Sequence, residues 1–230
     1  MKIGVVSFPG SNCDEDAYLA AVEHLGCEAV MLWHKAHDLE GSDVIILPGG
    51  FSYGDYLRSG AIARFSPIMQ EVVAHAKRGA PVIGICNGFQ IACEAGLLPG
   101  ALMRNASLQF RSMPVTIRVE RTDTPFTVLC RTGDLLTMPI AHGDGRFTVD
   151  APTLERIEGE GLVVFRYVDA DGVTSEAANP NGSLDNIAGV TNAARNVVGL
   201  MPHPERALEP LLGSDDGSIL FRSLLATVAA

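Results

Sequence analysis

The segment Gly84-Ile85-Cys86-Asn87-Gly88 joins two stretches of different character. The apolar residues 81–85 are typical of a buried strand, and the mixed residues 87–96 are typical of a short helix. A cysteine at such a junction, with glycine two positions away on either side, follows the pattern of a nucleophile elbow with Cys in place of Ser. The glycines leave room for the turn, and the N–H groups of the helix start favour a thiolate and an oxyanion. The alternative is a buried structural cysteine.

Strand-like and helix-like segments alternate from residue 2 to residue 96. The expected strands are residues 2–7, 28–32, 44–47 and 81–85, and the expected helices are residues 13–25, 67–78 and 87–96. Asn12, with Glu15 three residues later, is a capping pair for the first helix. This alternation predicts an α/β fold with an open, mostly parallel sheet that is flanked by helices.

The second half of the chain has a different pattern, which predicts a mixed or antiparallel extension of the sheet. Its strand-like segments are residues 115–121, 126–129, 162–168 and 197–201. A helix is expected over residues 218–228. Because no linker, repeat or low-complexity tract separates the halves, we expect residues 1–230 to form a single domain.

Composition narrows the class of protein. The 17 Lys and Arg against 27 Asp and Glu give a net charge of -10, which argues against a nucleic-acid binder. No apolar run approaches the length of a membrane span, and the opening segment has no small-residue cleavage site of a signal peptide. The five cysteines are an odd, scattered set, which indicates a reducing cytoplasm rather than a disulfide framework.

The second motif is Met201-Pro202-His203-Pro204-Glu205, at the end of the last expected strand. Residues two apart in an extended segment point the same way, and the prolines stiffen the backbone. His203 and Glu205 can therefore act together, with the His as base for Cys86 and the Glu orienting the imidazole. A lone His near a chain end is usually structural, but the elbow in the same chain favours catalysis.

Two strand ends are expected to share one crevice, because ligands bind beyond the carboxyl ends of parallel strands. The strand over residues 44–47 ends in Pro48-Gly49-Gly50, and the next one ends in Cys86. We predict that the backbone N–H groups of Gly50 and Asn87 form an oxyanion hole. An ordinary glycine turn is the alternative.

Further candidates follow these motifs. Gln90, one helical turn beyond Cys86, is a candidate for binding the substrate, and an ordinary surface amide is the alternative. The loop over residues 52–62 is rich in aromatic residues. Its Tyr53, Tyr56 and Arg58 are candidates for a partner interface, since Tyr and Arg are favoured at interfaces. A packed loop is the alternative.

Two other features are not expected to carry chemistry. Cys13, in the first turn of the first helix, is a rival nucleophile but lacks an elbow, so it is interpreted as a bystander. His34 and His37 have a spacing that suits a metal on a helix, but no carboxylate or Cys cluster accompanies them. We expect a solvated loop there and no metal site.

Residues 84–90 and 201–206 resemble the motifs of class I glutamine amidotransferases. The resemblance gives Cys86 the role of nucleophile, His203 that of base and Glu205 that of third triad member. It also implies a flavodoxin-like fold.

Further motifs resemble the family of stand-alone glutaminase subunits of phosphoribosylformylglycinamidine synthases; they are residues 10–14, 49–58, 141–147 and 179–182. His142, within one of them, is expected to be a buried structural histidine rather than a glutamine or partner contact. Two departures occur: Ser112-Met113 stands where the family often shows Cys-Arg, and Asp144 stands where Glu is expected.

The resemblance implies an activity and partners. Glutamine would be hydrolysed through a Cys thioester, and the ammonia would pass to a large ATP-dependent synthetase subunit, assembled with a small accessory subunit. That complex would make formylglycinamidine ribonucleotide in purine biosynthesis in the cytoplasm. ATP and magnesium are expected on the synthetase and no cofactor in this chain, which has no Gly-x-x-x-x-Gly-Lys-Ser/Thr motif.

Three alternatives remain at this stage. They are a glutaminase subunit of another amidotransferase, a stand-alone cysteine hydrolase or peptidase of similar fold, and a non-catalytic binding module. Intact residues at all three triad positions argue against the last. Ammonia release from glutamine, with and without a synthetase, separates them.

Overall fold

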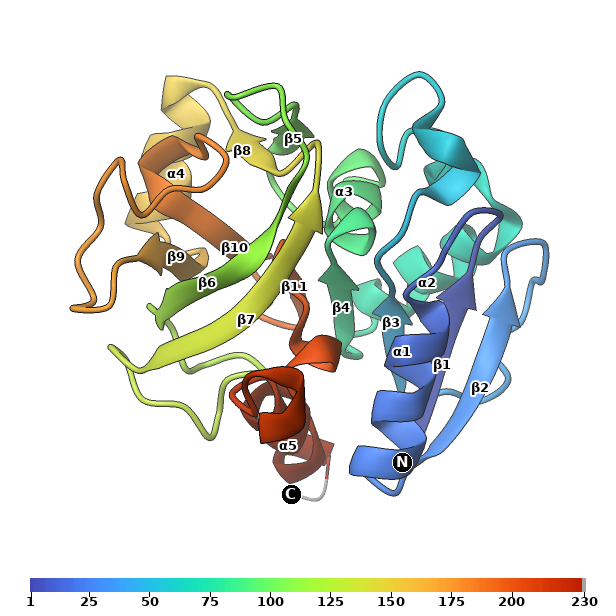
Figure 1. The fold of residues 1–230 in the computed structure, drawn as a ribbon. Helices are drawn as coiled ribbons and strands as arrows, with labels where there is room; N and C mark the ends of the chain where they lie inside the picture. Colours follow the sequence, from blue (N-terminus) through green and yellow to red (C-terminus); the bar gives the residue numbers. More distant parts are fainter. Residues whose placement is uncertain (229–230) are drawn as a thin grey trace.

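The computed structural model describes residues 1–228, which form one large sheet, one small sheet and helices around them (Figure 1). The strands of the large sheet are β1 (Lys2–Ser7), β2 (Glu28–Trp33), β3 (Val44–Leu47), β4 (Val82–Ile85), β6 (Arg111–Val119), β7 (Leu135–His142), β9 (Val163–Val168), β10 (Ile187–Thr191) and β11 (Val197–Leu200). The small sheet pairs β5 (Ala101–Met103) with β8 (Arg146–Thr148). The helices are α1 (Asp14–Leu19), α2 (Pro67–Lys77), α3 (Asn87–Glu94), α4 (Ala151–Gly159) and α5 (Ser218–Val228).

The large sheet has the order β2-β1-β3-β4-β11-β10-β9-β6-β7. The first five strands in this order pair in parallel, and the later pairs are antiparallel. Only β10 and β6 therefore run against the common direction. The predicted fold, a mostly parallel sheet with an antiparallel extension in the second half, is confirmed.

Helices cover both faces of the parallel half, with α1 on the near side of the sheet in Figure 1 and α2 on the far side. The reason is topological: the chain moves outward from β1 to β2 but in the opposite direction from β3 to β4. Right-handed crossovers then place the two connecting helices on opposite faces. The four residues of β3 are fully buried, as the continuous apolar run predicted.

Two local predictions are wrong, and one helix was missed. Residues 126–129 form turns rather than a strand, and a hydrogen bond of 2.8 Å between the Thr124 and Thr127 hydroxyls lies in this region. Asn12 does not cap α1; its Oδ1 instead accepts from the Cys13 thiol at 3.4 Å. Helix α4 was not expected, although Asp150 caps it by accepting from the Thr153 N–H at 3.0 Å.

The carboxyl ends of β1, β3, β4 and β11 lie side by side at one edge of the sheet. The segments that follow them carry Cys13, Gly50, Cys86 and His203. The sheet therefore brings together residues that are far apart in the sequence. Among residues 1–228, no helix is long and apolar enough to span a bilayer.

Candidate active site

Cys86 lies at a sharp turn between β4 and α3, with φ of 51° and ψ of -105°. This backbone conformation is strained for a residue with a side chain, and such strain concentrates at functional sites. Both flanking glycines are needed for space. A Cβ on Gly84 would lie 2.6 Å from the Gly88 carbonyl oxygen, and one on Gly88 would collide with the Leu47 carbonyl.

His203 and Glu205 form a buried pair directly after β11. The Nδ1 of His203 lies 2.6 Å from Oε1 of Glu205, and the side chains are 1% and 0% exposed. The His203 N–H donates to the Pro139 carbonyl at 2.9 Å, which fixes the backbone of the pair against β7. Gly49 leaves room for the ring, since a Cβ there would lie 2.7 Å from His203 Cε1.

The environment of His203 favours its charged form. Burial alone would lower the pKa of the imidazole, but interactions with the neighbouring side chains, Glu205 first and then Cys86, raise that pKa well above its ordinary value. The other nitrogen, Nε2, has no hydrogen-bond partner among the described residues, and neither does Oε2 of Glu205. A charged imidazole with a free N–H is suited to proton delivery.

Cys86 lies beside His203, but no hydrogen bond joins its thiol to this free nitrogen among the described residues. Its Sγ donates to the Ala141 carbonyl at 3.7 Å. Ala141 lies near the end of β7, next to His142. The Cys86 side chain thus contacts the antiparallel half of the sheet.

The two predicted oxyanion donors lie on neighbouring loops. Asn87 is the first residue of α3, and N–H groups in the first turn of a helix have no partner within the helix. Its side-chain oxygen accepts from the Ser52 N–H at 3.1 Å, which fastens the loop after β3 to the elbow. Gly50 has φ of +130°, and a Cβ there would lie 2.7 Å from the Asn12 nitrogen.

Gln90 is buried, and both the nitrogen and the oxygen of its side-chain amide form hydrogen bonds. Its Nε2 donates to the Asp144 carbonyl at 2.6 Å, and its Oε1 accepts from Asn87 Nδ2 at 2.8 Å. Asp144 also accepts from the Ser59 hydroxyl at 2.9 Å. Asp144 therefore ties the end of β7 to the nucleophile helix and to the loop after β3.

His142 is buried within a polar network that the sequence did not reveal. Its Nδ1 lies 3.2 Å from Asn105 Oδ1, and Asn181 Nδ2 lies 3.5 Å from its Nε2. Asn105 Oδ1 also accepts from the Gly145 N–H, so Nδ1 of His142 carries the proton.

Burial and the neighbouring His203 lower the pKa of His142 to about 4. The prediction of a buried histidine is confirmed; the Asn-Pro-Asn-Gly motif containing Asn181 was the available signal for the network.

The three candidate partner residues differ in exposure. Tyr53 is partly buried, and its hydroxyl lies 2.7 Å from His34 Nδ1. His34 is itself buried, so the expected solvated loop is wrong at that position. Tyr56 is 74% exposed. Arg58 donates through Nε and Nη2 to the Glu94 carboxylate at 2.5 and 2.7 Å, which joins the loop to the end of α3.

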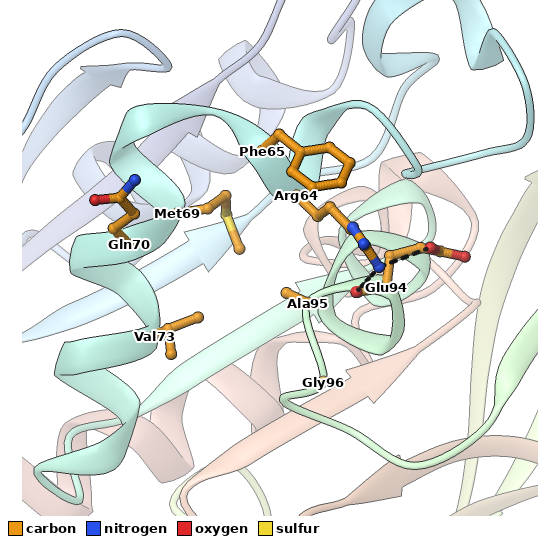
Figure 2. A pocket seen from close by; sticks show the side chains of 8 residues that line it. All are labelled: Arg64, Phe65, Met69, Gln70, Val73, Glu94, Ala95 and Gly96. Carbon is orange, nitrogen blue, oxygen red and sulfur yellow. Dashed lines mark hydrogen bonds and ion pairs between the residues drawn. The ribbon is translucent and has the colours of Figure 1, made fainter.

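Glu94 also borders a cavity of about 610 Å³ between α2 and the end of α3. Figure 2 shows Arg64 reaching Glu94 beside the exposed ring of Phe65. None of the triad candidates lines this cavity. The cavity is therefore separate from the elbow, although Glu94 links it to the loop that carries Arg58.

Cys13, interpreted from sequence as a bystander, lies close to the His203–Glu205 pair. Donor atoms of Cys13, His203 and Glu205 lie within 4.8 Å of one another, a spacing that a metal ion could use. Arg206 Nη2, however, donates to Cys13 Sγ at 3.2 Å. Its positive charge opposes the binding of a cation at this place.

An elbow cysteine and a His–Glu pair at the carboxyl edge of a parallel sheet are the parts of a glutamine amidotransferase of the cysteine type. The chain belongs to the family of CobB/CobQ-like glutamine amidotransferase domains, which it matches over residues 1–215. A glutamine amidotransferase from Thermotoga maritima shares the fold, with a TM-score of 0.63, 17% identity, and coverage of 99% of this chain and 97% of that one.

More similar relatives are phosphoribosylformylglycinamidine synthase subunits PurQ. The chain is 57% identical to the PurQ of Salinibacter ruber over 99% of this chain and 97% of that protein. It is 58% identical to the PurQ of Rubrobacter xylanophilus over 98% of both. A chain in the structure of PurLQS from Thermotoga maritima has a TM-score of 0.86 and 44% identity, covering 99% of this chain and 98% of that one.

Proposed function

We propose that this chain is the glutaminase subunit of a phosphoribosylformylglycinamidine synthase. It hydrolyses glutamine to glutamate and ammonia, which a synthetase subunit uses to make formylglycinamidine ribonucleotide in de novo purine biosynthesis. The observation that carries this proposal is the buried His203–Glu205 pair beside the Cys86 elbow, in a chain 57% identical to a PurQ over nearly its whole length.

The chemistry follows from the residues. The Cys86 thiolate attacks the side-chain amide carbon of glutamine, and the N–H groups of Gly50 and Asn87 stabilise the oxyanion. Protonated His203 gives its proton to the leaving nitrogen, so ammonia departs and a thioester remains. Water, deprotonated by His203, then attacks the thioester, which releases glutamate and restores the Cys86 thiolate. Glu205 orients the imidazole throughout, and Gln90 holds the wall of the site through Asp144.

The proposed partners are a large synthetase subunit and a small accessory subunit. ATP and magnesium belong to the synthetase, and this chain needs no cofactor for thioester chemistry. The name of the PurLQS structure supports an assembly of this kind. Residues 1–230 act as one glutamine amidotransferase domain, supported by a single sheet that takes strands from both halves of the described chain. The free cysteines suit a reducing cytoplasm.

The test replaces Cys86 with Ala in the assembled complex. Glutamine-dependent synthesis should be lost, while synthesis from added ammonia should continue, because only ammonia generation uses the thiolate. Cys27→Ala is the matched control and should keep both activities. Loss of both activities in Cys86→Ala would contradict the proposal, as would hydrolysis of peptides or esters with no requirement for glutamine.

A further inference from the structure

The Cys13 sulfur lies within 4.8 Å of a ring nitrogen of His203, although 190 positions separate the two residues. Its side chain is buried, and a Cβ on Gly49 would lie 3.1 Å from Cys13 Sγ and 2.7 Å from His203 Cε1. The sulfur and the carbon edge of the ring therefore border the same point in space. Glu205 holds only the Nδ1 side of the ring, so a contact on this other edge restricts its rotation.

The sulfur is itself fixed. Arg206 donates through Nη2 to Cys13 Sγ at 3.2 Å and through Nε to Asp16 Oδ2 at 2.8 Å. A guanidinium only donates, so the sulfur accepts this bond, and its own proton is directed to Asn12 Oδ1 at 3.4 Å. The thiol proton therefore points to Asn12 and not to His203. The sulfur remains as a fixed, polarisable neighbour of the ring.

The segment that carries Cys13 also holds the loop of the proposed oxyanion hole. Ser11 and Gly50 form an isolated antiparallel bridge, and the Phe51 N–H donates to the Gly10 carbonyl at 3.0 Å. Residues 10–13 therefore contact an oxyanion candidate on one side and the base on the other. One short segment can set the distance between these two parts of the site.

We propose that Cys13 is a positioning residue for the reaction: its sulfur, anchored by Arg206 and Asp16, holds the His203 imidazole with Nε2 directed toward the reacting atoms. This inference rests on the proposed function, because it assumes His203 as the base. Cys13 forms no bond to glutamine and does not replace Cys86 as nucleophile.

The experiment measures glutamine hydrolysis by Cys13→Ala and Cys13→Ser in the assembled complex. We expect kcat to fall at least about tenfold in Cys13→Ala with KM nearly unchanged, because base geometry and not glutamine binding is lost. Cys13→Ser should lose less, since a hydroxyl keeps the bonds to Arg206 and Asn12 but not the sulfur's volume. The alkaline limb of the kcat–pH profile should also move to lower pH, because the neighbouring Cys13 side chain contributes to the raised pKa of His203.

Asp16→Asn provides a second test that leaves the cysteine in place. Weakening the anchor of Arg206 should reduce kcat in the same direction by a smaller factor. Cys27→Ala, at a thiol away from the site, is the control and should match the wild type in kcat and in pH profile.

Three outcomes would overturn the inference. They are wild-type kcat and pH profile in Cys13→Ala, an effect of Cys13→Ala on KM alone, and an equal loss of ammonia-dependent synthesis, which would indicate failed assembly. Failure of the proposed function would look different: the wild-type complex would release no ammonia from glutamine, whatever residue occupies position 13.

Discussion

At the scale of residues, the site depends on a few side chains that are held under strain or without partners. Cys86 keeps a positive φ, which costs of the order of 1–3 kcal/mol and must be offset by the packing of β4 and α3. Nε2 of His203 is buried with no partner among the described atoms, at a cost that a purely structural histidine would avoid. Both features are explained if these atoms act on a substrate.

The first prediction separates His203 from Glu205. His203→Ala should reduce glutamine turnover more than Glu205→Ala does, because the imidazole moves protons while the carboxylate orients it. General acid–base groups contribute roughly a hundredfold to ten-thousandfold, which is the loss expected for His203→Ala. Steady-state ammonia release in the assembled complex measures both. Equal losses, with the fold intact by circular dichroism, would argue against the orienting role.

A second prediction concerns His142 and pH. Its folded pKa of about 4 lies below the ordinary value, so the unfolded chain binds a proton that the folded chain excludes. Stability should therefore fall as pH drops from about 6.5 to about 4, by at most about 1.4 kcal/mol per pH unit from this group. Urea unfolding at several pH values should show a flatter dependence in His142→Gln. An unchanged slope would assign the loss to other groups.

At the scale of elements, the loop after β3 is attached to helix α3 and also exposes residues on the surface of the molecule. Asn87 holds its beginning, and Arg58 holds its later part against Glu94 at the end of α3. Tyr53, Asp55 and Leu57 all have positive φ, so the loop is conformationally strained. A strained, anchored loop beside Gly50 can change the oxyanion site when a partner contacts it.

The third prediction tests the attachment of this loop to α3. Arg58→Ala should reduce the rise in glutamine turnover on addition of the synthetase more than it reduces basal turnover, because the loop loses its attachment to α3. The exposed Arg78, the C-cap residue directly after α2, gives the matched control Arg78→Ala, which should respond like the wild type. If glutamine turnover by Arg58→Ala rose as much as that of the wild type on addition of the synthetase, the loop would have no part in activation.

At the scale of the whole molecule, the candidate nucleophile and the candidate base are not joined by a hydrogen bond in the described chain. The Cys86 thiol donates to the Ala141 carbonyl, and the free nitrogen of His203 receives no bond from it in the described chain. Exposed apolar side chains lie on the loops beyond the elbow, including Leu57 and Leu108, and a partner could cover them. Glutamine hydrolysis in the absence of the synthetase would lose the ammonia to solvent. A glutaminase activity that rises only when the synthetase binds would avoid this loss.

The fourth prediction follows: glutamine turnover should rise at least about tenfold when the synthetase subunit is added, as a coupling of about 1.4 kcal/mol or more. Glutamate production by the purified chain, titrated with the partner, measures this rise. Full turnover by the chain alone, unchanged through the titration, would contradict it.

Local signals in the sequence were enough to predict the elbow. The apolar run of β4 and the glycines around Cys86 lie within a few residues of one another, so steric and periodic rules suffice to interpret them. The pairing of His203 with Glu205 was also predicted, but from the wrong geometry, because β11 ends at Leu200 and Pro204–Arg206 form a 3-10 helix rather than an extended segment. The same rules gave the wrong assignment at residues 126–129, where short apolar stretches do not distinguish a strand from packed turns.

The residues that surround Cys86, His203 and Glu205 come from distant parts of the chain and could not be predicted from local patterns. Cys13 and Arg206 are 193 positions apart, and they meet because β1 and β11 end at the same edge of the sheet. The Ala141 carbonyl and the Asn105–His142–Asn181 network reach the site for the same reason, through β7 and the loops of the antiparallel half. Strand order is set by long-range packing and not by local pattern, so no short motif could have predicted these contacts.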